Sequence, residues 1–195
     1  MRHNLSDIND LVKDRRTIYP KDFSDRIVHK EIIENIIRNA TWAPNHGLTQ
    51  PWRFKIYTGK GTQRLGDVLA KLYTEQTPQE EFKQRKLDNW LNRPKQSTAV
   101  IALNVELGLN ERIPAIEEKL AMACAVQNMM LTATAYGIGS FWSTGKMVYT
   151  PAMAAALNLP ANYECLGFLY LGYPSIDWPK SHRKPIEYIS EWIEE

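Results

Sequence analysis

The chain has 195 residues, of which 44% are hydrophobic and 24% are charged, and its formal net charge is +2 at pH 7. These values are ordinary for a globular protein, and the length allows one domain with a sizeable core. A charge so close to neutral gives no electrostatic basis for binding nucleic acid or an anionic membrane. We therefore expect a single domain over residues 1–195 with neither of these partners.

The most apolar stretch, AIEEKLAMACAVQNMMLTATAYGIG, contains acidic, basic and amide side chains. It therefore favours a helix buried in a domain or a subunit interface over a membrane span. The first residues show no apolar segment typical of a signal peptide. The two cysteines, Cys124 and Cys165, have apolar neighbours, which favours buried, reduced thiols in a cytoplasmic protein over a disulfide.

Hydrophobic periodicity and turn residues predict helices and strands in a mixed order. In chain order we expect a short helix capped by Ser6, an extended stretch around Pro20, a helix over 30–42, a strand over 52–59, two helices over 62–73 and 79–91, a strand over 98–106, a long helix over 114–136, a short strand over 139–145, a helix over 150–160 and a last strand over 165–174. Because helices and strands do not alternate steadily, the pattern indicates an α+β sandwich with helices around a central sheet.

The segment from about residue 79 to 95 carries many charges and only sparse apolar anchors, at Phe82, Leu87 and Trp90. Such a composition predicts the most exposed helical element of the fold. We expect it to act as a mobile cover over a site.

Common catalytic motifs are missing from the sequence. It has no glycine-rich dinucleotide motif after a strand, no phosphate-binding P-loop, no nucleophile elbow and no HExxH zinc motif. The four histidines are scattered and the cysteines few, so we expect no metal site. Cys124, in the middle of a helix, is expected to be inert rather than nucleophilic.

Arg15, Arg16 and Thr17 lie at the exit of the first helix. An arginine doublet is commonly a solvated pair of charges, and that interpretation stays open. The adjacent hydroxyl suggests instead a cluster of donors for phosphate or carbonyl oxygens. The basic tail segment KSHRKP is likewise solvated unless Arg183 completes a phosphate site.

The stretch WAPNHGLTQPWRF is unusually aromatic for a connection between a helix and a strand. Trp42 is either a core residue at a helix end or faces a ligand, and His46 either bonds the turn's backbone or faces the same ligand. The later stretch FWSTG is either a hydroxyl-rich turn or an aromatic wall with donors beside it. Together these pieces favour a flat aromatic ligand that carries a phosphate.

The segments RRT, WAPNHGLTQPWRF, GIGSFWSTG and LGFLYLGYP, in this order, closely resemble the flavin-dependent nitroreductase superfamily. Within it, the chain is most similar to the small bacterial YdjA-like branch, and the resemblance extends from about residue 10 to 174. Members of this family are FMN-binding α+β homodimers. The resemblance therefore implies an α/β/α sandwich with a central, mainly antiparallel sheet and two FMN sites at the subunit interface, each built from both chains.

The resemblance also implies which residues contact FMN. The arginines serve its phosphate and its N1/C2-carbonyl region, the aromatic loop reaches the flavin from the partner subunit, FWSTG lines the ring and ribityl side, and the tail arginine meets the phosphate. The residues implied in this way are Arg15, Arg16, Thr17, Trp42, His46, Trp142, Ser143, Thr144 and Arg183.

In such enzymes NAD(P)H gives a hydride to flavin N5, and a nitroaromatic, a quinone or a related electrophile then takes the electrons in a ping-pong cycle. No protein nucleophile is required. Many nitroreductases carry Asn where this chain has His46, and the departure bears on the substrate class. Two alternatives stay open: sibling chemistry on the same fold, namely dehalogenation, enone reduction or flavin breakdown, and a non-catalytic FMN sensor or store.

Overall fold

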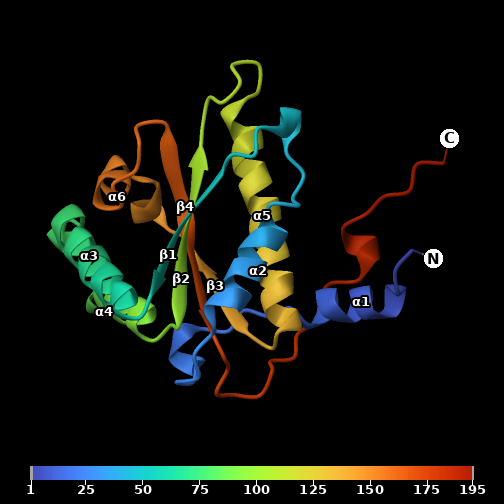
Figure 1. Cartoon of the computed structure of the whole chain (residues 1–195), viewed down its shortest axis with the longest axis horizontal. Coiled ribbons are helices and arrows are strands. Elements are labelled where there is room, and N and C mark those ends of the chain that lie inside the picture. Colours follow the sequence, from blue (N-terminus) through green and yellow to red (C-terminus); the bar gives the residue numbers. More distant parts are fainter. Residues whose placement is uncertain (1, 195) are drawn as a thin grey trace.

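The computed structural model describes residues 2–194 and contains a four-stranded sheet with helices on both sides (Figure 1). Short 3-10 turns cover Pro20–Asp22, His46–Leu48, Gln79–Glu81, Lys146–Tyr149 and Ile186–Tyr188. The helices are α1 (Leu5–Asp14), α2 (Lys30–Ala40), α3 (Lys60–Gln76), α4 (Gln84–Lys95), α5 (Ala115–Ala135) and α6 (Pro151–Ala156), and the strands are β1 (Trp52–Thr58), β2 (Ala99–Glu106), β3 (Gly139–Ser143) and β4 (Tyr163–Gly172).

The sheet is antiparallel throughout and has the order β1-β2-β4-β3. The two central strands, β2 and β4, are the apolar runs that the sequence indicates, and nearly all of their residues are buried. Their register shifts between Ala102 and Asn104, opposite Gly167. Gly167 has φ +132°, which side chains rarely adopt, so the shift needs glycine at this point.

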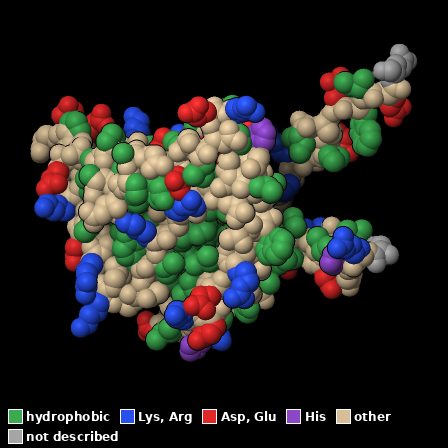
Figure 2. All heavy atoms as spheres, turned by 45° about the horizontal axis from the view of Figure 1, so that its top comes forward, with side chains coloured by type: hydrophobic (Ala, Val, Ile, Leu, Met, Phe, Trp, Pro, Cys, Tyr) green, Lys and Arg blue, Asp and Glu red, His purple; other side chains and the backbone are tan. Residues whose placement is uncertain are grey.

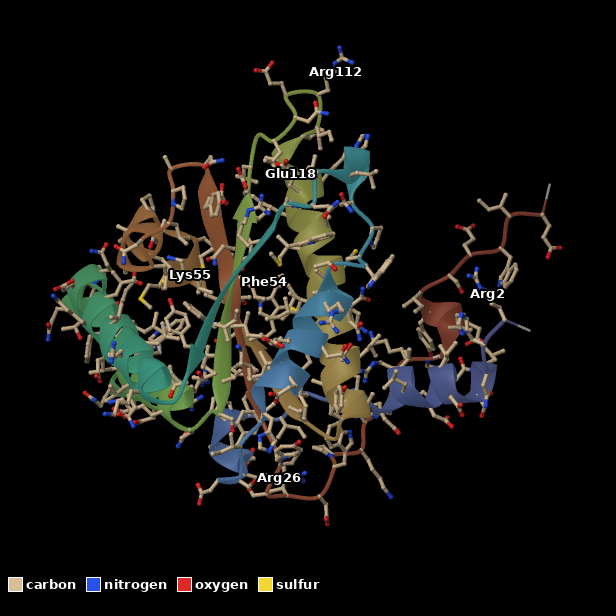
Figure 3. The ribbon with its side chains drawn as sticks, in the orientation of Figure 1. Arg2, Arg26, Phe54, Lys55, Arg112 and Glu118 are labelled. Carbon is tan, nitrogen blue, oxygen red and sulfur yellow. The ribbon has the colours of Figure 1, made fainter. Side chains whose placement is uncertain are left out.

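Each face of the sheet has its own hydrophobic core. On one face α2 and α5 pack on Ile101, Leu103 and Leu169, and on the other α3 and α6 pack on Val100 and Phe168. The alternation follows from the pleat of a strand, which turns successive side chains to opposite faces. Figure 3 shows it on β1, where Phe54 points toward α5 and Lys55 toward α6. The expected α+β sandwich is confirmed at this level.

The predicted helices and strands are present, with several shifted ends, whereas the stretch expected to be extended around Pro20 forms a 3-10 turn over Pro20–Asp22. Asn4 caps α1 by accepting a hydrogen bond from the Ser6 amide at 3.1 Å, so the prediction of a Ser6 cap is wrong. The charged helix begins at Gln84 and not near residue 79, because the Lys83 amide donates to the Tyr73 hydroxyl at 3.0 Å. Its last turn then continues through Pro94 to Lys95.

The cysteines are both free but differ in environment. Cys165 is buried between β4 and α6, where burial raises the pKa of its thiol to about 11. Cys124 is exposed, so the expectation that both thiols are buried is wrong for this residue. It lies on the side of α5 that does not face the sheet. Within residues 2–194, no helix combines the length and apolarity that crossing a membrane requires.

Two terminal segments extend away from the sandwich on its α5 side (Figure 1). Helix α1 has no buried residue, although its apolar side chains Leu5, Ile8 and Val12 lie on one side. The tail from Lys180 to Glu194 is also exposed, including Trp192 near its end. Figure 2 shows hydrophobic side chains on both projecting segments.

Candidate functional site

Three arginines gather where α1 ends and the C-terminal tail passes it. Arg15 is half-buried, and its pKa is lowered by burial and by the nearby charges of Arg183 and Arg16. Among residues 2–194, no ion pair involves any of the three. The cluster therefore has positive charge without a protein counterion, which favours binding of an anion.

A side-chain hydrogen bond joins the tail to the end of α1. The Trp178 indole donates to the carbonyl of Asp14 at 2.5 Å, which places the tail beside the end of α1. The Arg16 guanidinium donates to the carbonyls of Lys13 and Arg15, the latter at 2.8 Å. Its buried Nε has no hydrogen-bond partner within residues 2–194. This donor remains available to a ligand.

A line of contacts leads from the arginines along the edge strand β3. Thr17 forms a parallel bridge with Ser140, at the start of β3. Just beyond this bridge, the rings of Tyr19 and Phe141 lie 4.8 Å apart. The guanidinium of Arg93, from α4, lies 5.0 Å from the centre of the Phe141 ring on the same side. The arginine cluster and α4 thus lie beside one strip of surface, formed by 17–19 and β3.

At the far end of this strip is an open pocket of about 560 Å³. One wall is formed by the end of α3, the turn that follows it and α4. The opposite wall is the connection from β3 to α6. Ser143, which is buried, and Thr144, which is exposed, lie on the β3 side. The residues contributed by the α3–α4 side include Tyr73, Glu81, Lys86, Asn89, Trp90 and Arg93.

Trp142 does not line this pocket. Because side chains alternate along β3, its indole lies on the α2/α5 face, where it packs against that core. Its Nε1 donates to the Leu166 carbonyl at 3.1 Å, directly beside Gly167. Within one chain, the structure brings Ser143 and Thr144 together and separates Trp142 from them.

Trp42 and His46 lie on a loop that runs beside α5 at the surface. The Trp42 side chain is 81% exposed, so it is not a core residue of the helix end. His46 contacts Glu117, in the first turn of α5, through Nδ1 and Oε2 at 2.5 Å, instead of bonding the turn's backbone. Leu48 and Gln50 have positive φ, a strained conformation that persists where the surroundings impose it. Neither Trp42 nor His46 reaches the pocket of its own chain.

Sequence reasoning expected the segment 79–95 beside a site but missed the role of Arg93 in the pocket wall. Burial lowers the pKa of Arg93, while the adjacent Tyr170 hydroxyl is fully buried, has no partner and has its pKa raised by burial. The one available signal was the spacing of Trp90 and Arg93, which places both on one side of a helix. Among residues 2–194, no group of histidines, cysteines and carboxylates could hold a metal ion.

The fold is thus an α+β sandwich with an arginine cluster at one end of an edge strand and a polar, aromatic pocket at the other. Residues 12–173 match the sequence profile described as the Nitroreductase family. The chain belongs to the nitroreductase family.

Relatives extend the likeness over most of the chain. The Escherichia coli K12 protein YdjA, named provisionally as an NAD(P)H nitroreductase, is 29% identical over 146 residues, which cover 75% of this chain and 78% of YdjA. A nitroreductase-like family protein from Bacillus cereus has a TM-score of 0.84 and 26% identity, with 99% of both chains covered. The FMN-dependent nitroreductase NfnB from Mycobacterium smegmatis, solved with NADPH, has a TM-score of 0.74 at 19% identity, over 98% of this chain and all of NfnB.

Proposed function

We propose that this chain is an FMN-dependent oxidoreductase that oxidises NAD(P)H and reduces nitroaromatic, quinone or related electrophilic acceptors. The observation that carries the proposal is the cluster of Arg15, Arg16 and Arg183, which has no carboxylate partner in the described chain. The phosphate of FMN is a dianion that matches such a cluster. The names of YdjA and NfnB support the same cofactor and reductant.

The remaining FMN contacts follow the strip along β3. Thr17 would bind next to the phosphate, and Ser143 and Thr144 would offer donors to the polar edge of the ring. Arg93 adds a positive charge on the pocket side of the strip, which suits the N1/C2-carbonyl region that the family resemblance gives to Arg15 or Arg16. When bound, FMN supplies the redox chemistry by accepting a hydride and returning its electrons.

The net reaction needs no protein nucleophile. NAD(P)H and one proton convert a nitro group to a nitroso group and water, or a quinone to a hydroquinone. The protein's part is to bind and orient the two ligands in turn, and to hold positive charge where negative charge develops.

The proposed enzyme is a homodimer, because Trp42 and His46 are exposed in one chain and would complete the site of the partner. Helix α5 supports this arrangement, since Ile116, Leu120 and Cys124 form an exposed stripe at helical spacing beside that loop. In this arrangement the segment 79–95, which contains α4 and is the predicted cover, would close over the bound ligand.

An absorbance spectrum of the purified protein tests the proposal. We expect flavin bands that bleach after anaerobic addition of NADH or NADPH and return on addition of a nitroaromatic or a quinone. Bands that never bleach would support an FMN store or sensor instead. A colourless protein that also ignores added FMN would contradict the proposal outright.

A further inference from the structure

The pocket beside α4 carries more positive than negative charge. Lys86 and Arg93 enter from α4, and Lys146 from the connection after β3, whereas Glu81 is the one carboxylate among the residues that line the pocket. None of the three cations forms an ion pair among residues 2–194. The chain thus leaves these charges without protein partners at the same site.

The three cationic side chains differ in how far they are buried. Arg93 is half-buried over the Phe141 ring, and its position suits the flavin. Lys86 and Lys146 are exposed and belong to opposite walls. Their long side chains can converge on a group that enters between the walls, next to the flat surface of Trp90.

We propose that Lys86 and Lys146 bind an anionic group, a carboxylate or a phosphate, on the aromatic ligand that exchanges electrons at this site. The inference rests on the proposed function and names the class of ligand. The anion has two possible sources: a carboxylate on the electron acceptor, or a phosphate of the nicotinamide dinucleotide. One lysine at a surface contributes little, but two that converge on one anion act together and exclude cationic ligands.

The test uses the FMN-loaded protein and the double variant Lys86→Met, Lys146→Met, which removes both charges but keeps long, unbranched side chains. We expect the double variant to lower kcat/KM for 4-nitrobenzoate about tenfold while leaving nitrobenzene unchanged. The ratio of kcat/KM between parent and variant is taken for each acceptor separately, so that the different intrinsic reactivities of the two acceptors do not affect the comparison. For the parent, raising the salt concentration from about 0.05 M to about 0.5 M should weaken only the charged acceptor.

The second arm measures bleaching of the flavin by NADPH and by NADH. A loss confined to 4-nitrobenzoate assigns the anion to the acceptor, and a loss confined to the dinucleotides assigns it to the reductant. Lys71→Met, on the exposed side of α3 beside Glu75, is the matched control and should change neither. Unchanged values for all ligands in the double variant would overturn the inference.

Calorimetric binding of 4-nitrobenzoate gives a readout that does not need turnover. Binding to the parent that is lost in the double variant supports the lysine site even if no reductant bleaches the flavin. Absent binding of 4-nitrobenzoate to the parent, together with equal bleaching by NADPH and NADH in parent and double variant and with normal nitrobenzene turnover, would contradict the inference and leave the proposed function intact. The two failures are therefore distinguishable.

Discussion

At the scale of single residues, the distinctive feature is positive charge that the chain does not neutralise. Arg15 has its pKa lowered by burial and by two neighbouring guanidiniums, so the folded protein holds this charge at a cost. A bound dianion would remove the repulsion and satisfy the free Nε of Arg16. FMN should therefore stabilise the fold by mass action.

Arg15→Met is expected to weaken FMN binding at least about tenfold, because a charge-assisted hydrogen bond contributes about 1.5–3 kcal/mol. Arg15 is a cleaner target than Arg16, whose side chain also bonds two carbonyls at the end of α1. Quenching of flavin fluorescence during titration of the apoprotein measures the affinity. Arg38→Met, on α2, is the control. Equal affinity in the Arg15 variant would exclude this residue from the phosphate site.

At the scale of elements, the pocket depends on how closely α4 packs against α3. A Cβ atom added at Gly66 would lie 2.4 Å from the carbonyl oxygen of Leu91, so glycine is needed where the two helices meet. Lys95 adds an ion pair to Asp67 at 2.8 Å, and Trp90 meets the ring of Phe168 edge-on. Mobility of α4 stays a prediction. If α4 moves, the contacts of Leu91, Lys95 and Trp90 are the ones that must break.

Gly66→Ala should therefore destabilise the protein, although alanine normally stabilises a helix by about 1 kcal/mol relative to glycine. Displacing α4 should also change the KM for acceptors, since α4 forms a wall of the pocket. Urea unfolding and steady-state kinetics measure the two effects. Gly61→Ala is the matched control in the same helix, where the added Cβ would make an ordinary 3.8 Å contact and should be stabilising. A Gly66 variant as stable as the Gly61 variant would refute this role.

The sequence predicts these elements well, but it predicts the residues that meet at the candidate site poorly. The apolar runs of β2 and β4 and the Ala/Met-rich α5 are local signals, because each element buries its own residues. For the pocket wall formed by Arg93 the sequence offers only the spacing of Trp90 and Arg93, because a charged helix has the same local pattern whether it faces solvent or a ligand. Likewise Arg15 and Arg183 meet only because the tail returns to α1, and the family resemblance, not periodicity, related them to one ligand.

At the scale of the whole molecule, the apolar surface is concentrated on the α5 side. There α1, the loop with Trp42, the stripe on α5 and the C-terminal tail all expose large hydrophobic side chains. A monomer seldom exposes so many, which indicates a surface for another chain. The proposed second copy suits this surface, because one two-fold axis through α5 would cover the stripe on both chains at once.

We expect the protein in solution to have twice the 22.5 kDa mass of one chain, and Leu120→Asp to convert it to a monomer. Leu120 is 57% exposed on the α5 stripe, where two buried carboxylates near the axis would repel each other without partners. Light scattering after gel filtration measures the mass. The same variant should lose FMN, because Trp42 and His46 would then be missing from the partner's site, and Cys124 should react faster with iodoacetamide.

Val68→Asp, on the exposed side of α3, makes the same chemical change away from α5 and should leave mass, FMN content and Cys124 reactivity unaltered. The three readouts separate the possible failures. A Leu120→Asp protein that stays dimeric would place the interface elsewhere. A monomer that keeps FMN at full affinity would mean that one chain completes the site alone, since a site shared between subunits cannot survive their separation.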